Sequence, residues 1–115
     1  MRVLVCGGRD YKDRDKVFDV LDDLHREHGA LIIIEGGAAG ADTFAGEWTC
    51  IERTGRLITE PSEWVRYGSP AGPIRNAKMI SDHKPEIVVA FPGGRGTADM
   101  VHQARGASIK VVEVL

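Results

Sequence analysis

Three glycine-rich segments, each directly after an apolar run, carry residues suited to binding an anion. They read Gly7-Gly8-Arg9-Asp10, Gly36-Gly37-Ala38-Ala39-Gly40-Ala41-Asp42 and Pro92-Gly93-Gly94-Arg95-Gly96-Thr97. Glycines just past a parallel strand permit a tight turn and let backbone N–H groups approach a negatively charged group. A helix that follows adds its N-terminal donors and its dipole. The three segments together predict a site for a phosphate-bearing ligand.

Each segment also has a simpler interpretation, because a glycine pair after a strand is ordinary turn chemistry. The second segment lacks the G-x-G-x-x-G spacing of a dinucleotide fingerprint, since its glycines fall at 36, 37 and 40. No segment ends in the G-K-[ST] of a P-loop. The hydroxyl of Thr97 and the carboxylate of Asp42 are alternatively helix caps that touch no ligand.

Charged residues near these segments extend the predicted site. Arg9 and Arg95 lie inside the segments, and guanidinium groups pair well with phosphate oxygens. Arg75 stands at the start of a predicted helix and is followed by Lys78, for which we favour a solvated surface charge. A further group are candidate acceptors for ribose hydroxyls or a base edge: Asp10, Glu35 and Asp99.

Other kinds of chemistry find little support. No cluster of His, Cys and carboxylates has metal-ligand spacing, and His25 and His28 at a predicted helix end are expected to face solvent. We therefore expect no metal and no cofactor, and no Ser/His/Asp arrangement is apparent. Cys6 and Cys50 lie in apolar patterns and are interpreted as reduced core thiols, with a catalytic Cys6 as the alternative.

The elements that position these residues alternate between strands and helices. Strands are expected at Arg2–Cys6, Leu31–Ile34, Arg56–Thr59, Glu86–Phe91 and Ser108–Leu115, and helices at Arg14–His28, Asp42–Arg53, Ile74–Ser81 and Thr97–Gly106. This alternation is typical of an α/β, Rossmann-like, doubly wound and mainly parallel five-stranded sheet with helices on both faces. In such a sheet the loops after the strands lie at one edge, so the three glycine segments should meet in one crevice.

One irregular stretch interrupts this alternation. The stretch Pro61–Pro73 contains Trp64, Tyr67, Gly68, Pro70 and Gly72. The stretch is either a binding loop or mobile lid, or a packed connector with a short helix at Ser62–Arg66.

Bulk composition limits the class of protein. The 115 residues are 43% hydrophobic and 28% charged, which is ordinary for one globular domain over residues 1–115. The net charge of −2 gives no overall basic field to attract nucleic acid or an anionic membrane. No run approaches the about 18 apolar residues of a membrane span, and the start carries no signal peptide, so we expect a cytoplasmic protein.

The combination of motifs resembles the SLOG superfamily, which includes the lonely-guy phosphoribohydrolases and the DNA-processing Smf proteins. The match is nearest to its small single-domain bacterial and phage branch, and rests on the three glycine segments, Trp48, Ala71-Gly72-Pro73-Ile74-Arg75-Asn76 and the stretch Phe91–Met100. The resemblance spans nearly the whole chain. It implies a Rossmann-like fold and a nucleotide-derived ligand, as bound by related domains in signalling or defence systems.

The lonely-guy motifs R-K-x-x-M and P-G-G-x-G-T-x-x-E are only partly present. Their arginine and methionine match Arg75 and Met79, while Asn76 replaces the lysine. The position of their catalytic glutamate falls on Met100. The nearest carboxylate, Asp99, is one residue early, a rotation of about 100° on a helix. Arg75 and Asp99 are therefore the catalytic candidates, and Asp10 or Glu35 are possible substitutes from neighbouring loops.

Two functions from different classes follow. The first is a binding module that senses or sequesters a nucleoside monophosphate or an ADP-ribose- or NAD-related molecule, and the second is a nucleotide N-glycosidase or phosphoribohydrolase. We place binding first, because the anion segments are intact and the glutamate is missing. Single-stranded DNA binding is a weaker third, since the acidic chain lacks an aromatic platform. A homo-oligomer is expected from the resemblance, with Trp48, Trp64 and Tyr67 in its contact.

Overall fold

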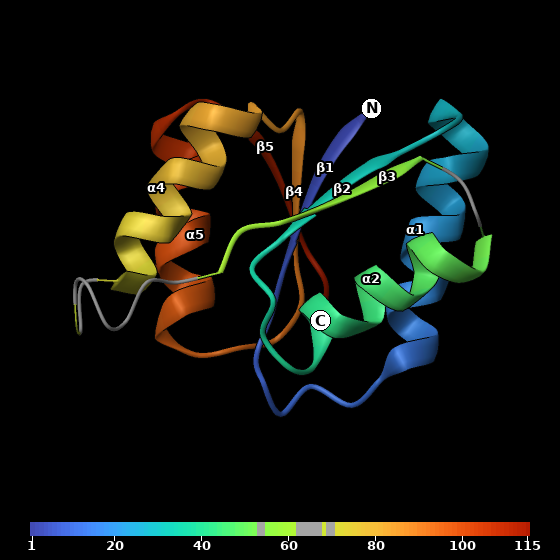
Figure 1. Cartoon of the computed structure of the whole chain (residues 1–115), viewed down its shortest axis with the longest axis horizontal. Helices are drawn as coiled ribbons and strands as arrows, with labels where there is room; N and C mark the ends of the chain where they lie inside the picture. The colour runs from blue at the N-terminus through green and yellow to red at the C-terminus, as the bar shows by residue number, and fades with distance from the viewer. Residues whose placement is uncertain (53–54, 62–67, 69–70) are drawn as a thin grey trace.

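Five short strands form one parallel sheet in the order β3-β2-β1-β4-β5 (Figure 1). The computed structural model describes residues 1–52, 55–61, 68 and 71–115. The strands are β1 (Arg2–Cys6), β2 (Ile32–Glu35), β3 (Arg56–Thr59), β4 (Ile87–Ala90) and β5 (Lys110–Glu113). The helices are α1 (Arg14–His28), α2 (Ala41–Glu52), α4 (Ala71–His83) and α5 (Arg95–Gly106). This confirms the predicted Rossmann-like α/β fold.

The sheet is covered on both faces, and each face has its own apolar core. On one face α1 and α2 pack Val17, Leu21 and Trp48 against side chains of β1, β2 and β4. On the other face α4 and α5 pack Met79 and Met100 against the alternate side chains of the same strands. The central strands are therefore nearly all apolar, whereas β3 and β5 at the two edges are more exposed.

Two predictions about individual side chains are wrong. Trp48 is fully buried in the core of its own chain and donates from Nε1 to Asp22, 2.8 Å away, so it cannot form a contact between subunits. Cys50 is exposed rather than a core thiol, while Cys6 is buried as expected. Both errors arise on α2, whose buried face runs through Ala41, Ala45 and Trp48.

The last two helices begin earlier than their predicted starts. α4 begins at Ala71, so Pro73 lies within its first turn, where its missing N–H removes no helical bond. α5 begins at Arg95 after Gly94, and no side-chain hydrogen bond caps it, so Thr97 is not the cap. The prediction of a lid or a helix at Ser62–Arg66 falls mostly on residues outside the described part, as do Trp64 and Tyr67.

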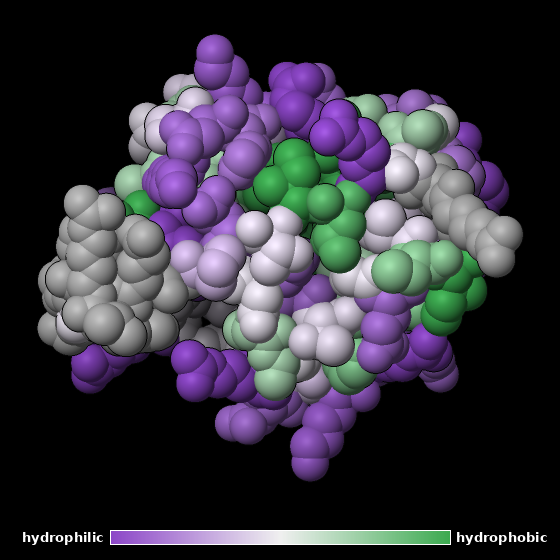
Figure 2. All heavy atoms as spheres, in the orientation of Figure 1, coloured by the Kyte–Doolittle hydropathy of each residue, from purple (hydrophilic) through white to green (hydrophobic). Residues whose placement is uncertain are grey.

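The order of the strands places a crevice at one edge of the sheet. From β1 the chain moves outward to β2 and β3, then returns to add β4 and β5 on the other side of β1. The loops after β1 and β4 thus leave toward opposite faces, which opens the crevice where ligands bind in such sheets. Figure 2 shows hydrophilic side chains around much of the rim of the visible face and a group of apolar ones near its centre. In the described part of the chain, no helix is long and apolar enough to cross a membrane.

Candidate functional site

A pocket of about 1090 Å³ opens at the carboxyl ends of the strands. The loops after β1, β2 and β4 line it, together with the first turns of α4 and α5. Every residue predicted for the site lines this pocket except Glu35 and Gly40. The volume lies at the upper end of the range for small-molecule sites, so a nucleotide-sized ligand fits it.

The start of α5 is the part of the pocket best suited to an anion. Gly94 precedes the helix, and no side chain caps its first turn, so the first backbone N–H groups of α5 have no capping side chain, at residues that line the pocket. Arg95 and Arg9 are exposed on the pocket wall, and neither forms an ion pair with a described residue. A side chain at position 94 or 96 would enter open space, because no protein atom lies within 4 Å of the added Cβ.

The loop after β1 is tied to the loop after β4. The amide of Gly8 donates to the carbonyl of Pro92 at 2.9 Å, so this donor is already satisfied. A Cβ on Gly93 would press on Gly8 N at 2.6 Å and on the Thr97 hydroxyl, which explains the glycine there. These two loops therefore form one rigid wall of the crevice.

The loop after β2 binds carboxylates of its own chain. The amides of Gly36 and Ala38 both donate to Asp42 Oδ2, at 3.0 and 3.3 Å. The amide of Gly37 donates to Glu35 Oε2 at 2.6 Å, and the hydroxyl of Thr59 donates to the other oxygen of Glu35. Asp42 is thus a clamp on the preceding loop, and Glu35, which is 4% exposed, holds the loop from behind.

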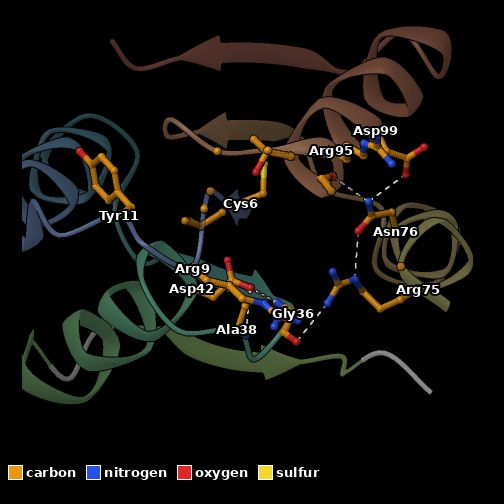
Figure 3. Close-up of a pocket in the computed structure, with 18 of the residues that line it drawn as sticks. Cys6, Arg9, Tyr11, Gly36, Ala38, Asp42, Arg75, Asn76, Arg95 and Asp99 are labelled. Atoms are coloured by element: carbon orange, nitrogen blue, oxygen red, sulfur yellow. Dashed lines mark hydrogen bonds between the residues drawn. The ribbon is translucent and has the colours of Figure 1, made fainter. Parts of the chain in front are cut away.

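A hydrogen-bonded chain of side chains crosses the pocket from α5 to this loop (Figure 3). Asn76, which is 2% exposed, donates from Nδ2 to Asp99 at 2.9 Å and to the carbonyl of Gly96 at 3.1 Å. Its Oδ1 accepts from Arg75 Nε at 3.0 Å, and Arg75 Nη1 donates to the carbonyl of Gly36 at 3.0 Å. Arg75 is therefore fixed within the pocket wall, and is no solvated surface charge.

Asp99 lines the pocket but is already engaged. Its Oδ2 accepts from both Asn76 and Gln103, at 2.9 and 2.8 Å. Met100, at the position of the lonely-guy glutamate, is fully buried in the core under α5. The chain thus has a thioether in the core where those enzymes have their carboxylate.

Two titratable groups beside the crevice have shifted pKa values. Burial raises the pKa of Asp42 from 3.8 to about 6; the Ala38 and Gly36 amides and Arg75 oppose this rise, and Glu35 adds to it. Burial also raises the pKa of Cys6 to about 12, helped by Asp42 and opposed by Arg75. Cys6 lines the pocket as a neutral thiol at neutral pH, which disfavours the catalytic alternative. Among the described residues, no group of three or more His, Cys, Asp or Glu side chains is placed to hold a metal ion.

Sequence reasoning missed Tyr11 in the lining of the pocket. The ring of Tyr11 packs against Phe91, with centroids 5.3 Å apart, and offers an aromatic surface at the crevice. An aromatic residue directly after Gly7-Gly8-Arg9-Asp10 was the available signal. Pro61, Gly72 and Pro73 also line the pocket, and all three belong to the stretch 61–73 that we interpret as either a binding loop or a packed connector.

Fold and site together define a parallel α/β domain with a ligand crevice at its topological switch point. The chain belongs to the YAcAr family, described as the YspA, cpYpsA-related SLOG family, whose model matches residues 1–67. It is also similar to the Gene 61 protein of Mycobacterium phage D29, with 37% identity over 118 residues, covering 96% of this chain and 94% of the phage protein. Membership of a SLOG family associates the chain, in general terms, with nucleotide-derived ligands.

Proposed function

We propose that this domain binds a phosphate-bearing, nucleotide-derived ligand and thereby senses or sequesters it. A nucleoside monophosphate or an ADP-ribose- or NAD-related molecule suits the pocket. The observation that carries the proposal is the uncapped first turn of α5, whose residues line a large pocket together with Arg9 and Arg95. A phosphate there gains hydrogen bonds, the helix dipole and two guanidinium groups.

Binding is favoured over hydrolysis by the state of the α5 carboxylate. Asp99 is held by two amide groups, and Met100 occupies the core. A carboxylate that stabilises an oxocarbenium-like state must instead face the sugar.

Isothermal titration calorimetry with AMP, ADP-ribose and NAD tests the proposal, with Gly96→Asp as the key variant. The new carboxylate enters open space and suits a helix start, yet it competes with phosphate for the same N–H groups. We expect binding by the natural chain and a loss of at least tenfold in affinity in the variant. Gly106→Asp is the matched control, because it adds the same charge at the far end of α5 in open space. Equal affinity in both variants would exclude the α5 site.

A nucleotide N-glycosidase is the second candidate, and one observation favours it. Asp42 lines the pocket with a pKa of about 6, the range suited to a general acid or base near neutral pH. Chromatography of the nucleotide after incubation separates the two functions. Freed base that disappears in Asp42→Asn establishes the enzyme, whereas bound nucleotide that stays whole establishes the binding module.

Self-association stays a prediction. With Trp48 internal, the large apolar side chains left for such a contact among the described residues are Ile51, Leu57, Ile74 and Leu115, each at least 39% exposed. We propose that Leu57 on the edge strand β3 takes part, and light scattering of Leu57→Asp tests this.

A further inference from the structure

The loop after β2 differs from the α5 start because its first three amides already have acceptors within the chain. Its three successive amides, from Gly36 to Ala38, already donate to Asp42 and Glu35. A phosphate placed at these three amides would find none of them free to donate to it, and it would be repelled by the nearby carboxylates that they bind. These three amides are therefore not available to a phosphate, although the sequence suggests that they bind one.

One oxygen of Asp42 remains available to a ligand. The carboxyl group is 5% exposed, and Oδ2 accepts both loop amides. Oδ1 has no hydrogen-bond partner among the described residues. Within that same part of the chain, no buried side-chain oxygen lacks a partner, so Oδ1 must reach the cavity that Asp42 lines. Figure 3 shows the Asp42 carboxylate beside Gly36 at the floor of this cavity.

The distance across the crevice suits one sugar phosphate. The ends of β2 and β4 are separated by β1, which is two strand spacings, or about 10 Å. A phosphate on the first turn of α5 would thus place an attached ribose over β1, with its far hydroxyls toward β2. Vicinal hydroxyls are strong donors to a carboxylate, and acidic side chains read ribose in this way in other α/β sheets.

We propose that Asp42 accepts hydrogen bonds from the 2′- and 3′-hydroxyls of a ribose whose 5′-phosphate lies on the first turn of α5. This rests on the proposed function and narrows the ligand to molecules with a 5′-phosphorylated ribose and a free diol. The β2 loop then selects against a second phosphate, because a 3′-phosphate or a 2′,3′-cyclic phosphate would meet the carboxylate of Asp42.

Calorimetry with AMP and with 2′,3′-dideoxy-AMP tests whether Asp42 binds the ribose hydroxyls. We expect the natural chain to bind AMP at least tenfold more tightly than the dideoxy nucleotide, the effect of hydrogen bonds to a charged acceptor. Asp42→Asn should remove this preference, so that the variant binds AMP and dideoxy-AMP with equal affinity. An asparagine Oδ1 can still accept the two loop amides, while its NH₂ group replaces the acceptor that faces the cavity.

Glu35→Gln is the matched control. It makes the same chemical change in the same loop, but at a side chain that does not line the pocket, so the preference for AMP should persist. Should Asp42→Asn fail to fold, Asp42→Ser replaces it, because a serine hydroxyl accepts one loop amide without extending to the cavity.

The possible failures can be told apart. Equal affinity of the natural chain for AMP and dideoxy-AMP would overturn the inference and leave the proposed function standing. A preference for AMP that survives both Asp42 variants would assign the sugar contact to another residue and also overturn it. If AMP, ADP-ribose and NAD all fail to bind, the proposed function fails, and the inference with it.

Discussion

The Nη1 atom of Arg75 donates to the carbonyl of Gly36, 3.0 Å away, and the guanidinium fills the space where a side chain at position 36 would lie. This contact joins α4 to the loop after β2, two elements 39 residues apart in the sequence. The absence of a side chain at Gly36 therefore leaves the space that the Arg75 guanidinium needs.

Gly36→Ala should expel the Arg75 guanidinium from its position. The added methyl group would overlap the guanidinium and press on Asp42 Oδ2 at 3.2 Å, so we expect the free energy of unfolding to fall by about 1–3 kcal/mol. Urea denaturation measures this change. Gly46→Ala is the control. Gly46 lies within helix α2, and its new methyl group would lie 3.5 Å from Leu57, an ordinary contact. Because alanine favours a helix more than glycine does, this substitution should raise the free energy of unfolding by about 0.5–1 kcal/mol. Equal effects of the two substitutions would contradict the packing argument.

Arg75→Ala should weaken nucleotide binding by about 1.5–3 kcal/mol, because it removes a charged donor from the pocket and releases the loop after β2. Arg75→Lys should recover little of this loss. A lysine has no fork of donors that reaches Asn76 and Gly36 at once. Calorimetry of both variants with AMP measures the effect. Full affinity in the lysine variant would mean that Arg75 contributes only its positive charge and not the geometry of its donors.

Asn76→Asp should destabilise the protein by about 3 kcal/mol or more. The substitution replaces a buried NH₂ donor by an oxygen that faces the carboxylate of Asp99 and the carbonyl of Gly96. Gln103→Glu makes the same change against the same carboxylate at a partly exposed position, and we expect a clearly smaller loss. Thermal and urea unfolding of both variants provide the comparison, and equal losses would mean that burial of Asn76 is unimportant.

Much of the fold could be predicted from local patterns in the sequence. Strands Arg2–Cys6 and Arg56–Thr59 and helix Arg14–His28 have their predicted bounds. For Arg14–His28, an Asp13 cap and a closing glycine at positive φ mark the two ends in the sequence. The nearly continuous apolar runs of the central strands likewise indicate a parallel sheet that is covered on both faces.

The candidate site was less predictable, because its hydrogen bonds depend on how the loops turn. Asp42 reaches back to Gly36 and Ala38 only because the chain between them turns through positive φ at Gly37 and Gly40. A pattern of residue types does not contain that path, so the same residues suggested an open anion loop. The burial of Asn76 and its link to Asp99 also depend on how α4 packs on α5, which no local pattern sets.

The raised pKa of Asp42 predicts how stability changes with pH. The pKa is about 6 in the folded chain against 3.8 as the ordinary value, so the folded state holds its proton more tightly. The resulting stabilisation is fully present below pH 3.8 and is lost as the pH rises through 6, by roughly 3 kcal/mol in all. The charged and titratable groups that face Asp42 are Glu35 on β2, Cys6 on β1 and Arg75 on α4, and only Glu35 carries a charge that favours the protonated form.

Urea denaturation of the natural chain and of Asp42→Asn between pH 4 and 7.5 isolates this contribution. Other groups, such as Glu60 with its lowered pKa, titrate in both proteins and cancel in the difference. We expect the natural chain to lose stability relative to the variant as the pH rises from 4 to 7, with most of the change complete by about pH 7. A difference that stays flat would mean that Asp42 ionises as readily in the fold as in water, and that its clamp on Gly36 and Ala38 fully offsets the cost of burial.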